Sequence, residues 1–203
     1  MEGADDTTVA VLTVLPEGFR MGQTAPVVFA FPPGDQSLDT TSALVDGTYE
    51  EEALARGWVV VSPVAPGGVS FWRGSEVHIG PILDWIETWV EPEGGLIHLL
   101  GVSNGGASVF RAADLHRGRF ASLTAFPGYP RGEGEIDAVV DIPVRLFVGG
   151  ADEPWVEPME TFAAELEALG GDVELEVIPD APHFIPQLAD GVVLFDTLDE
   201  LRP

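Results

Sequence analysis

The hydrophobic pattern of the chain alternates between two kinds of segment. Short runs of consecutive apolar residues are typical of strands that are buried on both faces of a sheet. These runs predict strands at residues 9–15, 27–31, 58–61, 96–102, 120–125, 144–148 and 173–178. Between them, apolar residues at helical spacing predict helices at residues 48–56, 76–90, 107–115, 159–169 and 188–201. Strands that alternate with helices indicate an α/β fold with a mostly parallel central sheet and helices on both faces.

Glycine and proline residues mark the ends of several of these elements. Gly57 and Gly170 follow expected helices and are typical helix stops. Pro81 lies inside the expected helix at 76–90 and predicts a break or a late start there. The chain has no internal repeat, and its 45% apolar content is enough for a substantial core. We therefore expect residues 1–203 to form a single domain.

The composition narrows the chemistry and the partners. The chain has no cysteine, which excludes disulfides, thiolate zinc sites and cysteine nucleophiles. It has 34 acidic residues against 9 basic ones, all arginine, and a net charge of −25. A field of that sign repels nucleic acid and anionic lipid, so we expect neither as a partner. We interpret the acidity as a solubility feature rather than an adaptation to high salt, because the apolar content is not reduced.

Membrane and targeting signals are missing from the sequence as given. No apolar run approaches the roughly 20 residues of a membrane span. The first residues, MEGADDTT, lack the basic and apolar regions of a signal peptide. This pattern fits a soluble cytoplasmic protein, or a secreted one whose leader has been removed. No segment has the acidic loop pattern that organises calcium, and we expect no metal site.

A serine lies where one expected strand turns into a helix. Residues 101–105 read Gly-Val-Ser-Asn-Gly, which fits the G-x-S-x-G pattern between a strand and a helix. Such a tight turn strains its central residue and needs small neighbours on both sides. The helix that follows offers free N–H groups and a positive dipole end to a developing oxyanion. Ser103 is therefore a candidate nucleophile, and the alternative is a helix N-cap in a glycine-rich loop.

Two further polar residues follow later strands. Asp152 comes after the strand at 144–148, where an aspartate can orient a histidine; the alternative is a turn or N-cap residue. His183 follows the last strand in the sequence Ala-Pro-His-Phe and can act as a general base. We expect His78 and His116 to lie on helix surfaces and His98 to be structural. Because ligands bind at the carboxyl ends of parallel strands, this edge is the expected site.

The chain order Ser, Asp, His after three strands resembles that of the α/β-hydrolase superfamily, over nearly the whole chain. The G-V-S-N-G-G turn, the G-G-A-D-E-P turn and the A-P-H-F loop are similar to those of small, lid-less bacterial esterases. They are also similar to the catalytic domains of prolyl-oligopeptidase-like and feruloyl-esterase-like hydrolases. The resemblance implies Ser103 as the nucleophile, His183 as the general base and then acid, and Asp152 as the orienting carboxylate. It implies no metal and no organic cofactor.

The resemblance also implies an oxyanion hole built from two backbone N–H groups. One donor is expected from Asn104, the residue after the nucleophile. The other is expected from the loop after the strand at 27–31, where family members often carry His-Gly-Gly-Gly. This chain has Phe-Pro-Pro-Gly-Asp there, and prolines have no N–H to donate. Gly34 and Asp35 remain as candidates.

The predicted function is that of a serine carboxylesterase acting on short-chain or aryl esters, with a small-molecule ester as its partner. The chain is close to the minimum length for the fold, so we expect no large cap domain. Trp72 and Trp155 are candidate substrate-binding residues, although ordinary packing under loops is the alternative. The acidic surface argues against anionic substrates. Two other functions stay open: a prolyl-oligopeptidase-type peptidase, with this chain a fragment of a longer protein, and a non-catalytic binding module on a hydrolase scaffold. Dienelactone-type hydrolysis normally uses a cysteine, which is absent.

Overall fold

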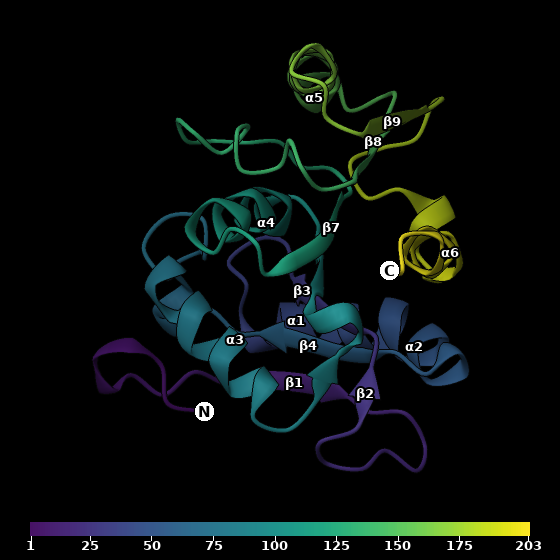
Figure 1. The fold of residues 1–203 in the computed structure, drawn as a ribbon. Helices are drawn as coiled ribbons and strands as arrows, with labels where there is room; N and C mark the ends of the chain where they lie inside the picture. Colours follow the sequence, from purple (N-terminus) through teal and green to yellow (C-terminus); the bar gives the residue numbers. More distant parts are fainter.

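A computed structural model describes residues 1–203, which build a sheet of seven strands (Figure 1). All neighbouring strands run parallel except the first pair, where β1 is antiparallel to β4. The spatial order is β1 (Val11–Val14), β4 (Val59–Pro63), β3 (Val27–Phe31), β6 (Ile97–Gly101), β7 (Phe120–Ala125), β8 (Val144–Gly149) and β9 (Val173–Ile178). Two short strands, β2 (Thr24–Ala25) and β5 (Glu91–Pro92), pair separately.

Helices cover both faces of this sheet. Figure 1 shows α3 and α4 on one side and α2 and α6 on the other. The helices are α1 (Leu38–Leu44), α2 (Glu50–Arg56), α3 (Ile79–Glu87), α4 (Asn104–Leu115), α5 (Glu153–Ala168) and α6 (Val192–Glu200). A π-helical turn at Val45–Tyr49 joins α1 to α2. None of the helices has both the length and the apolar character needed to cross a membrane.

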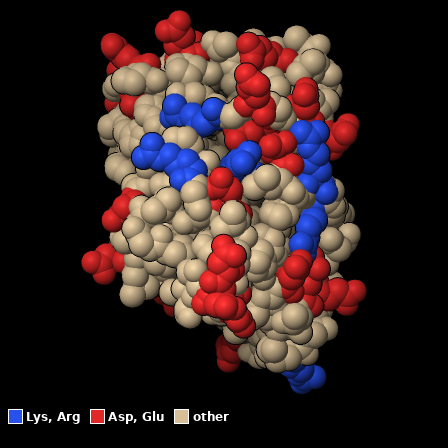
Figure 2. Space-filling model, turned by 90° about the vertical axis from the view of Figure 1, so that its left-hand side faces the viewer, with Lys and Arg blue, Asp and Glu red and all other residues tan.

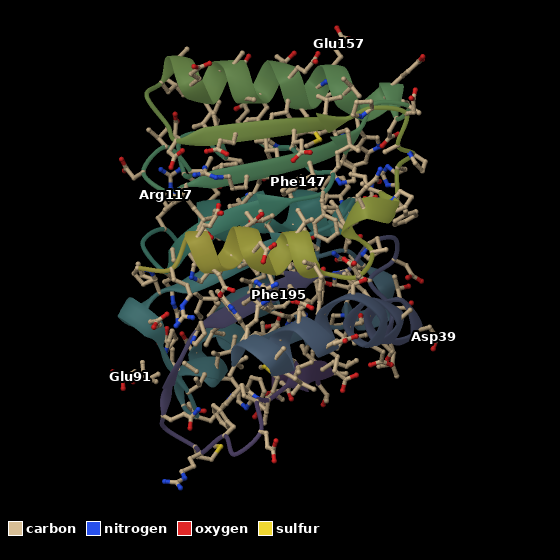
Figure 3. All side chains as sticks on the ribbon, turned by 90° about the vertical axis from the view of Figure 1, so that its right-hand side faces the viewer. Asp39, Glu91, Arg117, Phe147, Glu157 and Phe195 are labelled. Carbon is tan, nitrogen blue, oxygen red and sulfur yellow. The ribbon has the colours of Figure 1, made fainter.

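Two hydrophobic layers result, because successive side chains of a strand point to opposite faces. In β3, Val27, Phe29 and Phe31 belong to the layer under α3, α4 and α5, whereas Val28 and Ala30 belong to the layer under α2 and α6. Figure 3 shows Phe147 on β8 and Phe195 on α6, both members of the second layer. Burial on both faces explains the continuous apolar patterns of the central strands such as β3 and β4, whereas the edge strand β9 alternates.

Several helix boundaries differ from the expected ones: α4 begins at Asn104 rather than 107, and α6 begins at Val192 rather than 188. The prediction contained no helix before residue 48, yet α1 forms there, and the Ser37 side chain accepts a hydrogen bond from the Thr40 N–H at its start. The helix expected at 159–169 begins six residues earlier, at Glu153, with Pro154 in its first turn, where the missing N–H of proline costs nothing. The segment at 76–90 is one 3₁₀ turn followed by α3 from Ile79, so the late start is confirmed.

Two histidines are buried, and one of them was expected on the surface. His78 is 7% exposed, and its Nδ1 accepts a hydrogen bond from the Ala4 N–H at 3.0 Å. The surface prediction for His78 was therefore wrong: the N-terminal segment folds back over it. His98 in β6 is buried, its Nδ1 pairs with the Ser122 hydroxyl at 2.8 Å, and its ring contacts the Trp58 ring, as suits the structural role expected for it. Burial lowers the pKa of His98 to about 4, so this histidine is neutral near pH 7.

Candidate active site

The turn from β6 to α4 holds Ser103 in a strained backbone conformation. Its φ is 58° and its ψ is −115°, outside the regions that non-glycine residues normally occupy. The flanking glycines are required by contact. A Cβ on Gly101 would lie 2.3 Å from the Gly105 carbonyl oxygen, and one on Gly105 would lie 2.0 Å from the Phe31 carbonyl oxygen. The predicted need for small residues on both sides of Ser103 therefore has a specific steric cause. Ser103 is the N-cap residue of α4 by position, but its side chain makes no capping hydrogen bond.

The chain after β7 supports this turn from the other side. The Ser103 N–H donates to the Pro127 carbonyl, at 2.8 Å, and Pro127 follows a cis peptide bond. Gly128 packs directly against Gly106, where a Cβ on Gly128 would lie 2.5 Å from the Gly106 Cα. The segment that begins at Pro127 therefore starts in contact with the candidate nucleophile.

Asp152 and His183 lie together at the same edge of the sheet. The His183 Nδ1 and the Asp152 Oδ2 are 2.6 Å apart, and their side chains are 28% and 11% exposed. Asp152 precedes α5, yet its side chain makes no capping hydrogen bond to that helix. The N-cap alternative for Asp152 is therefore not realised, and the carboxylate faces the imidazole instead. The second imidazole nitrogen, Nε2, remains for a further partner.

Backbone contacts fix the loops that carry this pair. The Gly150 N–H donates to the Ile178 carbonyl at 2.8 Å, and the Ala151 N–H donates to the Ala181 carbonyl at 3.0 Å. A Cβ on Gly149 would lie 2.3 Å from the Ala181 carbonyl oxygen, so only glycine allows this approach. The ends of β8 and β9 are thus tied together immediately before Asp152 and His183.

The His183 loop also reaches the neighbourhood of Ser103. Phe184, Ile185 and Pro186 line an apolar cavity of about 160 Å³ together with Val102 and Phe126, which flank the nucleophile turn. Thr48 and Leu44 close the cavity from the segment that joins α1 to α2. The Ser103 hydroxyl itself makes no hydrogen bond in the structure. Catalytic hydrogen bonds are often long without substrate and tighten when it binds.

The expected oxyanion donors lie at adjoining backbone positions. Asn104 is the first residue of α4, so its N–H has no acceptor within the helix. The Asn104 side chain donates to the Gly34 carbonyl at 2.7 Å and ties the two donor segments together. The N–H of Gly34 has no acceptor in the protein, and that of Asp35 faces only its own carboxylate, whereas the next N–H, of Gln36, donates to the Pro33 carbonyl. The Asp35 carboxylate accepts hydrogen bonds from the Ser37 hydroxyl and the Ser37 N–H, and these hydrogen bonds lower the pKa of Asp35.

Gln36 supports this loop and was missed by the sequence analysis. It is fully buried, and its Nε2 donates to the Pro32 carbonyl at 3.0 Å and to the Ser108 hydroxyl at 3.1 Å. Its Oε1 accepts from the Phe71 N–H at 2.8 Å. Gln36 therefore joins the loop after β3 to α4 and to the loop after β4. A polar residue in a loop gives no sequence signal for burial of this kind.

The aromatic candidates have different surroundings. The Trp155 ring lies 5.2 Å from the His183 ring, between centroids. Trp72 pairs with Arg73, whose guanidinium carbon is 4.6 Å from the Trp72 ring centre, and no ring contact joins Trp72 to His183. Phe71, next to it, is fully buried in the core. The structure thus brings Trp155, but not Trp72, into contact with the candidate triad.

Solved structures with the same fold come from esterases and serine hydrolases. A thermostable esterase has a TM-score of 0.75 at 16% identity, over 98% of this chain and 61% of that one. Esterase 2 of Thermogutta terrifontis has a TM-score of 0.69 at 18% identity, over 98% and 89%. An alpha-beta serine hydrolase homologue from Coxiella burnetii has a TM-score of 0.65 at 19% identity, over 95% and 89%. This chain therefore spans less than two thirds of the first of these proteins.

These similarities define the class of fold. The chain has the α/β-hydrolase fold, and the expected architecture is confirmed. No protein-family model matches the sequence, and no curated protein is significantly similar to it. At identities below 20% the shared property is the fold, so the activity has to be argued from the site of this chain.

Proposed function

We propose that this protein is a serine carboxylesterase that hydrolyses short-chain or aryl esters through an acyl-enzyme. One observation carries the proposal: the strained Ser103 lies at the same sheet edge as an imidazole that is hydrogen-bonded to a carboxylate at 2.6 Å. The Ser-His-Asp chemistry needs these three groups and their order along the chain. A binding module needs neither the strain at Ser103 nor the Asp152–His183 pair.

In the proposed mechanism, His183 takes the proton of the Ser103 hydroxyl as the serine oxygen attacks the ester carbonyl. Asp152 holds the Nδ1–H of the imidazole and stabilises its protonated form. The oxyanion forms against the N–H of Asn104 and the N–H of Gly34 or Asp35. His183 then protonates the leaving alcohol, and water, activated by the same imidazole, hydrolyses the acyl-enzyme.

The cavity that Val102 and Phe126 line, next to the nucleophile turn, limits the size of the substrate. It is apolar, and its volume of about 160 Å³ suits a short acyl chain better than a fatty acid. The longest connection, at 126–143, contains no helix or strand from which a folded cap domain could be built. A seven-stranded core without a folded cap leaves the site open, which favours small esters over long triglycerides.

Hydrolysis of p-nitrophenyl esters from acetate to palmitate tests this function. We expect rapid turnover of the short esters and a loss of about 10⁴-fold or more in kcat for Ser103→Ala. Ser42→Ala, on α1, is a matched control that removes a hydroxyl without a side-chain hydrogen bond. No turnover of any ester by the folded wild-type chain would reject the esterase proposal. Acyl-peptide substrates would then be tested, because an acylaminoacyl peptidase from Pyrococcus horikoshii shares the fold at a TM-score of 0.62.

A further inference from the structure

The nine arginines of the chain differ in how their charges are balanced. Six of them form ion pairs with aspartate or glutamate: Arg56, Arg111, Arg117, Arg119, Arg145 and Arg202. Arg20, Arg73 and Arg131 have no carboxylate partner, although the chain carries 34 acidic residues. In Figure 2, blue side chains at the left of the view lie among uncharged atoms, whereas those at the right border acidic ones. An unpaired guanidinium in such a chain is available to a ligand.

Arg131 is held in place by aromatic rings rather than by a carboxylate. Its guanidinium carbon lies 3.8 Å from the Tyr129 ring centre and 4.9 Å from the Trp155 ring centre, within cation–π range. The two rings meet edge to face at 5.5 Å, and one guanidinium nitrogen, Nη1, donates to the Tyr129 hydroxyl. The Arg131 N–H donates to the buried Glu135 carboxylate at 2.8 Å. Backbone and side chain are therefore both fixed, although the residue is exposed.

The same ring that supports Arg131 contacts the candidate general base. Trp155 lies between the two, 4.9 Å from the guanidinium carbon and 5.2 Å from the His183 ring centre. Arg131 also belongs to the segment that begins at Pro127, whose carbonyl accepts the Ser103 N–H. The unpaired cation is thus linked to His183 through the Trp155 ring and to Ser103 through the segment that begins at Pro127.

We propose that Arg131, Tyr129 and Trp155 form a subsite for a carboxylate carried by the alcohol part of the ester. This inference rests on the proposed esterase function. Nε and Nη2 of Arg131 make no hydrogen bond within the protein, and together they match the two oxygens of a carboxylate. The alcohol part is the one concerned because His183 protonates the leaving oxygen, so the leaving group lies on the His183 side. The rings add an apolar surface for an aryl alcohol.

The acidic surface of the chain weakens the attraction of the Arg131 subsite for a carboxylate but does not cancel it. Arg131 opens onto a groove of about 610 Å³ that Glu133, Glu157 and Glu165 also line. Figure 3 shows Glu157 on the outer side of α5, away from the sheet. None of these glutamates forms an ion pair with Arg131, so its guanidinium stays free for a direct contact with a carboxylate, which salt screens less than it screens separated surface charges. The net charge of the chain disfavours anionic substrates, and Arg131 supplies a local exception.

The test compares two acetates of nearly equal shape, 3-acetoxybenzoate and 3-acetoxybenzamide, which differ in one negative charge. We expect Arg131→Gln to lower kcat/KM for the carboxylate by about tenfold relative to the amide, the range of a charge-assisted hydrogen bond. Arg131→Lys should keep part of the preference. Arg73→Gln is the matched control, because Arg73 is also unpaired and stacked on a tryptophan, Trp72, but this tryptophan makes no ring contact with His183. For Arg73→Gln, the ratio of kcat/KM for the carboxylate to kcat/KM for the amide should equal that of the wild type.

A second measurement separates this inference from the esterase proposal. Binding of the products 3-hydroxybenzoate and 3-hydroxybenzamide to Ser103→Ala, by isothermal titration, does not depend on turnover. Tighter binding of the acid, lost in the Ser103→Ala/Arg131→Gln double variant, supports the subsite even if no ester is hydrolysed. If the amide is hydrolysed normally but Arg131→Gln leaves the carboxylate-to-amide ratio unchanged, the subsite is rejected while the esterase function stands. Equal binding of acid and amide rejects it as well.

Discussion

Replacing Gly105 by alanine tests whether close backbone contact builds the site. The added Cβ would lie 2.0 Å from the Phe31 carbonyl oxygen and 2.7 Å from that of Pro32. Ordinary contact begins at 3.4 Å, so the first distance must grow by 1.4 Å, the difference between 3.4 and 2.0 Å. Backbone atoms on both sides leave no flexible side chain to move. The nucleophile turn and the loop after β3 must therefore separate.

That separation moves the two proposed oxyanion donors apart, because Asn104 lies on one segment and Gly34 and Asp35 on the other. A displacement of about 1 Å in a catalytic arrangement costs on the order of 100-fold in rate, similar to the loss of one oxyanion donor. Overpacking costs about 1–3 kcal/mol of stability. We expect Gly105→Ala to lose about 100-fold in kcat on p-nitrophenyl acetate and about 1–3 kcal/mol in urea unfolding.

Gly47→Ala is the control for this experiment. A Cβ added to Gly47 would have no heavy atom within 4 Å, and the residue has no positive φ, so an alanine there meets open space. We expect wild-type kcat and equal or slightly higher stability for the control. A folded Gly105→Ala protein with wild-type kcat would refute the argument that this contact positions the donors.

Three further predictions concern Asp152, Gln36 and His98. Asp152→Asn should lower kcat about 10⁴-fold in the ester assay, because the imidazole loses its orienting carboxylate. Glu153→Gln, at the exposed neighbouring position, should leave kcat unchanged, and equal effects of the two substitutions would contradict the role given to Asp152. Gln36→Leu leaves the Phe71 N–H and the Pro32 carbonyl without partners and should cost about 2–4 kcal/mol in urea unfolding; a loss below about 0.5 kcal/mol, within the range of surface substitutions, would contradict the role given to Gln36. The folded-state pKa of His98, about 4, lies below its ordinary value of 6.5, so the unfolded chain binds more protons between these values. Stability should be fully present above pH 6.5 and fall by up to roughly 3 kcal/mol as the pH drops to 4; His98→Gln should flatten this slope, and an unchanged slope would assign the effect to other groups.

The central sheet could be predicted because its strands carry the signal locally. β3, β7 and β9 have the expected bounds. β3 is an uninterrupted apolar run because it is buried on both faces, whereas the edge strand β9 alternates apolar and acidic residues. The helices were less predictable. α1 consists largely of small and polar residues with one buried position, Thr41, so its apolar periodicity is weak. Pro154 and Pro158 lie in the first half of α5 and hide its true start at Glu153.

The candidate site likewise contains residues that the sequence predicts and residues that it does not. Ser103, Asp152 and His183 each lie in a short local pattern at a strand end, and parallel strands bring such ends to one edge. Gln36 and Arg131 have no such pattern. Their environments come from residues distant in the chain, such as Ser108 at 72 positions from Gln36. The burial of a glutamine and the lack of an ion pair at an arginine become visible only when the loops are placed in space.

Active-site labelling tests the central claim most directly. A fluorophosphonate reacts with a serine only where a base activates the hydroxyl and an oxyanion site accepts the phosphoryl oxygen. Mass spectrometry of the intact protein and of its peptides then gives the stoichiometry and the modified residue. We expect one label per chain, on Ser103, and its loss in His183→Ala. An unlabelled folded protein, or a label on another serine, would contradict the proposal that Ser103 is a catalytic nucleophile.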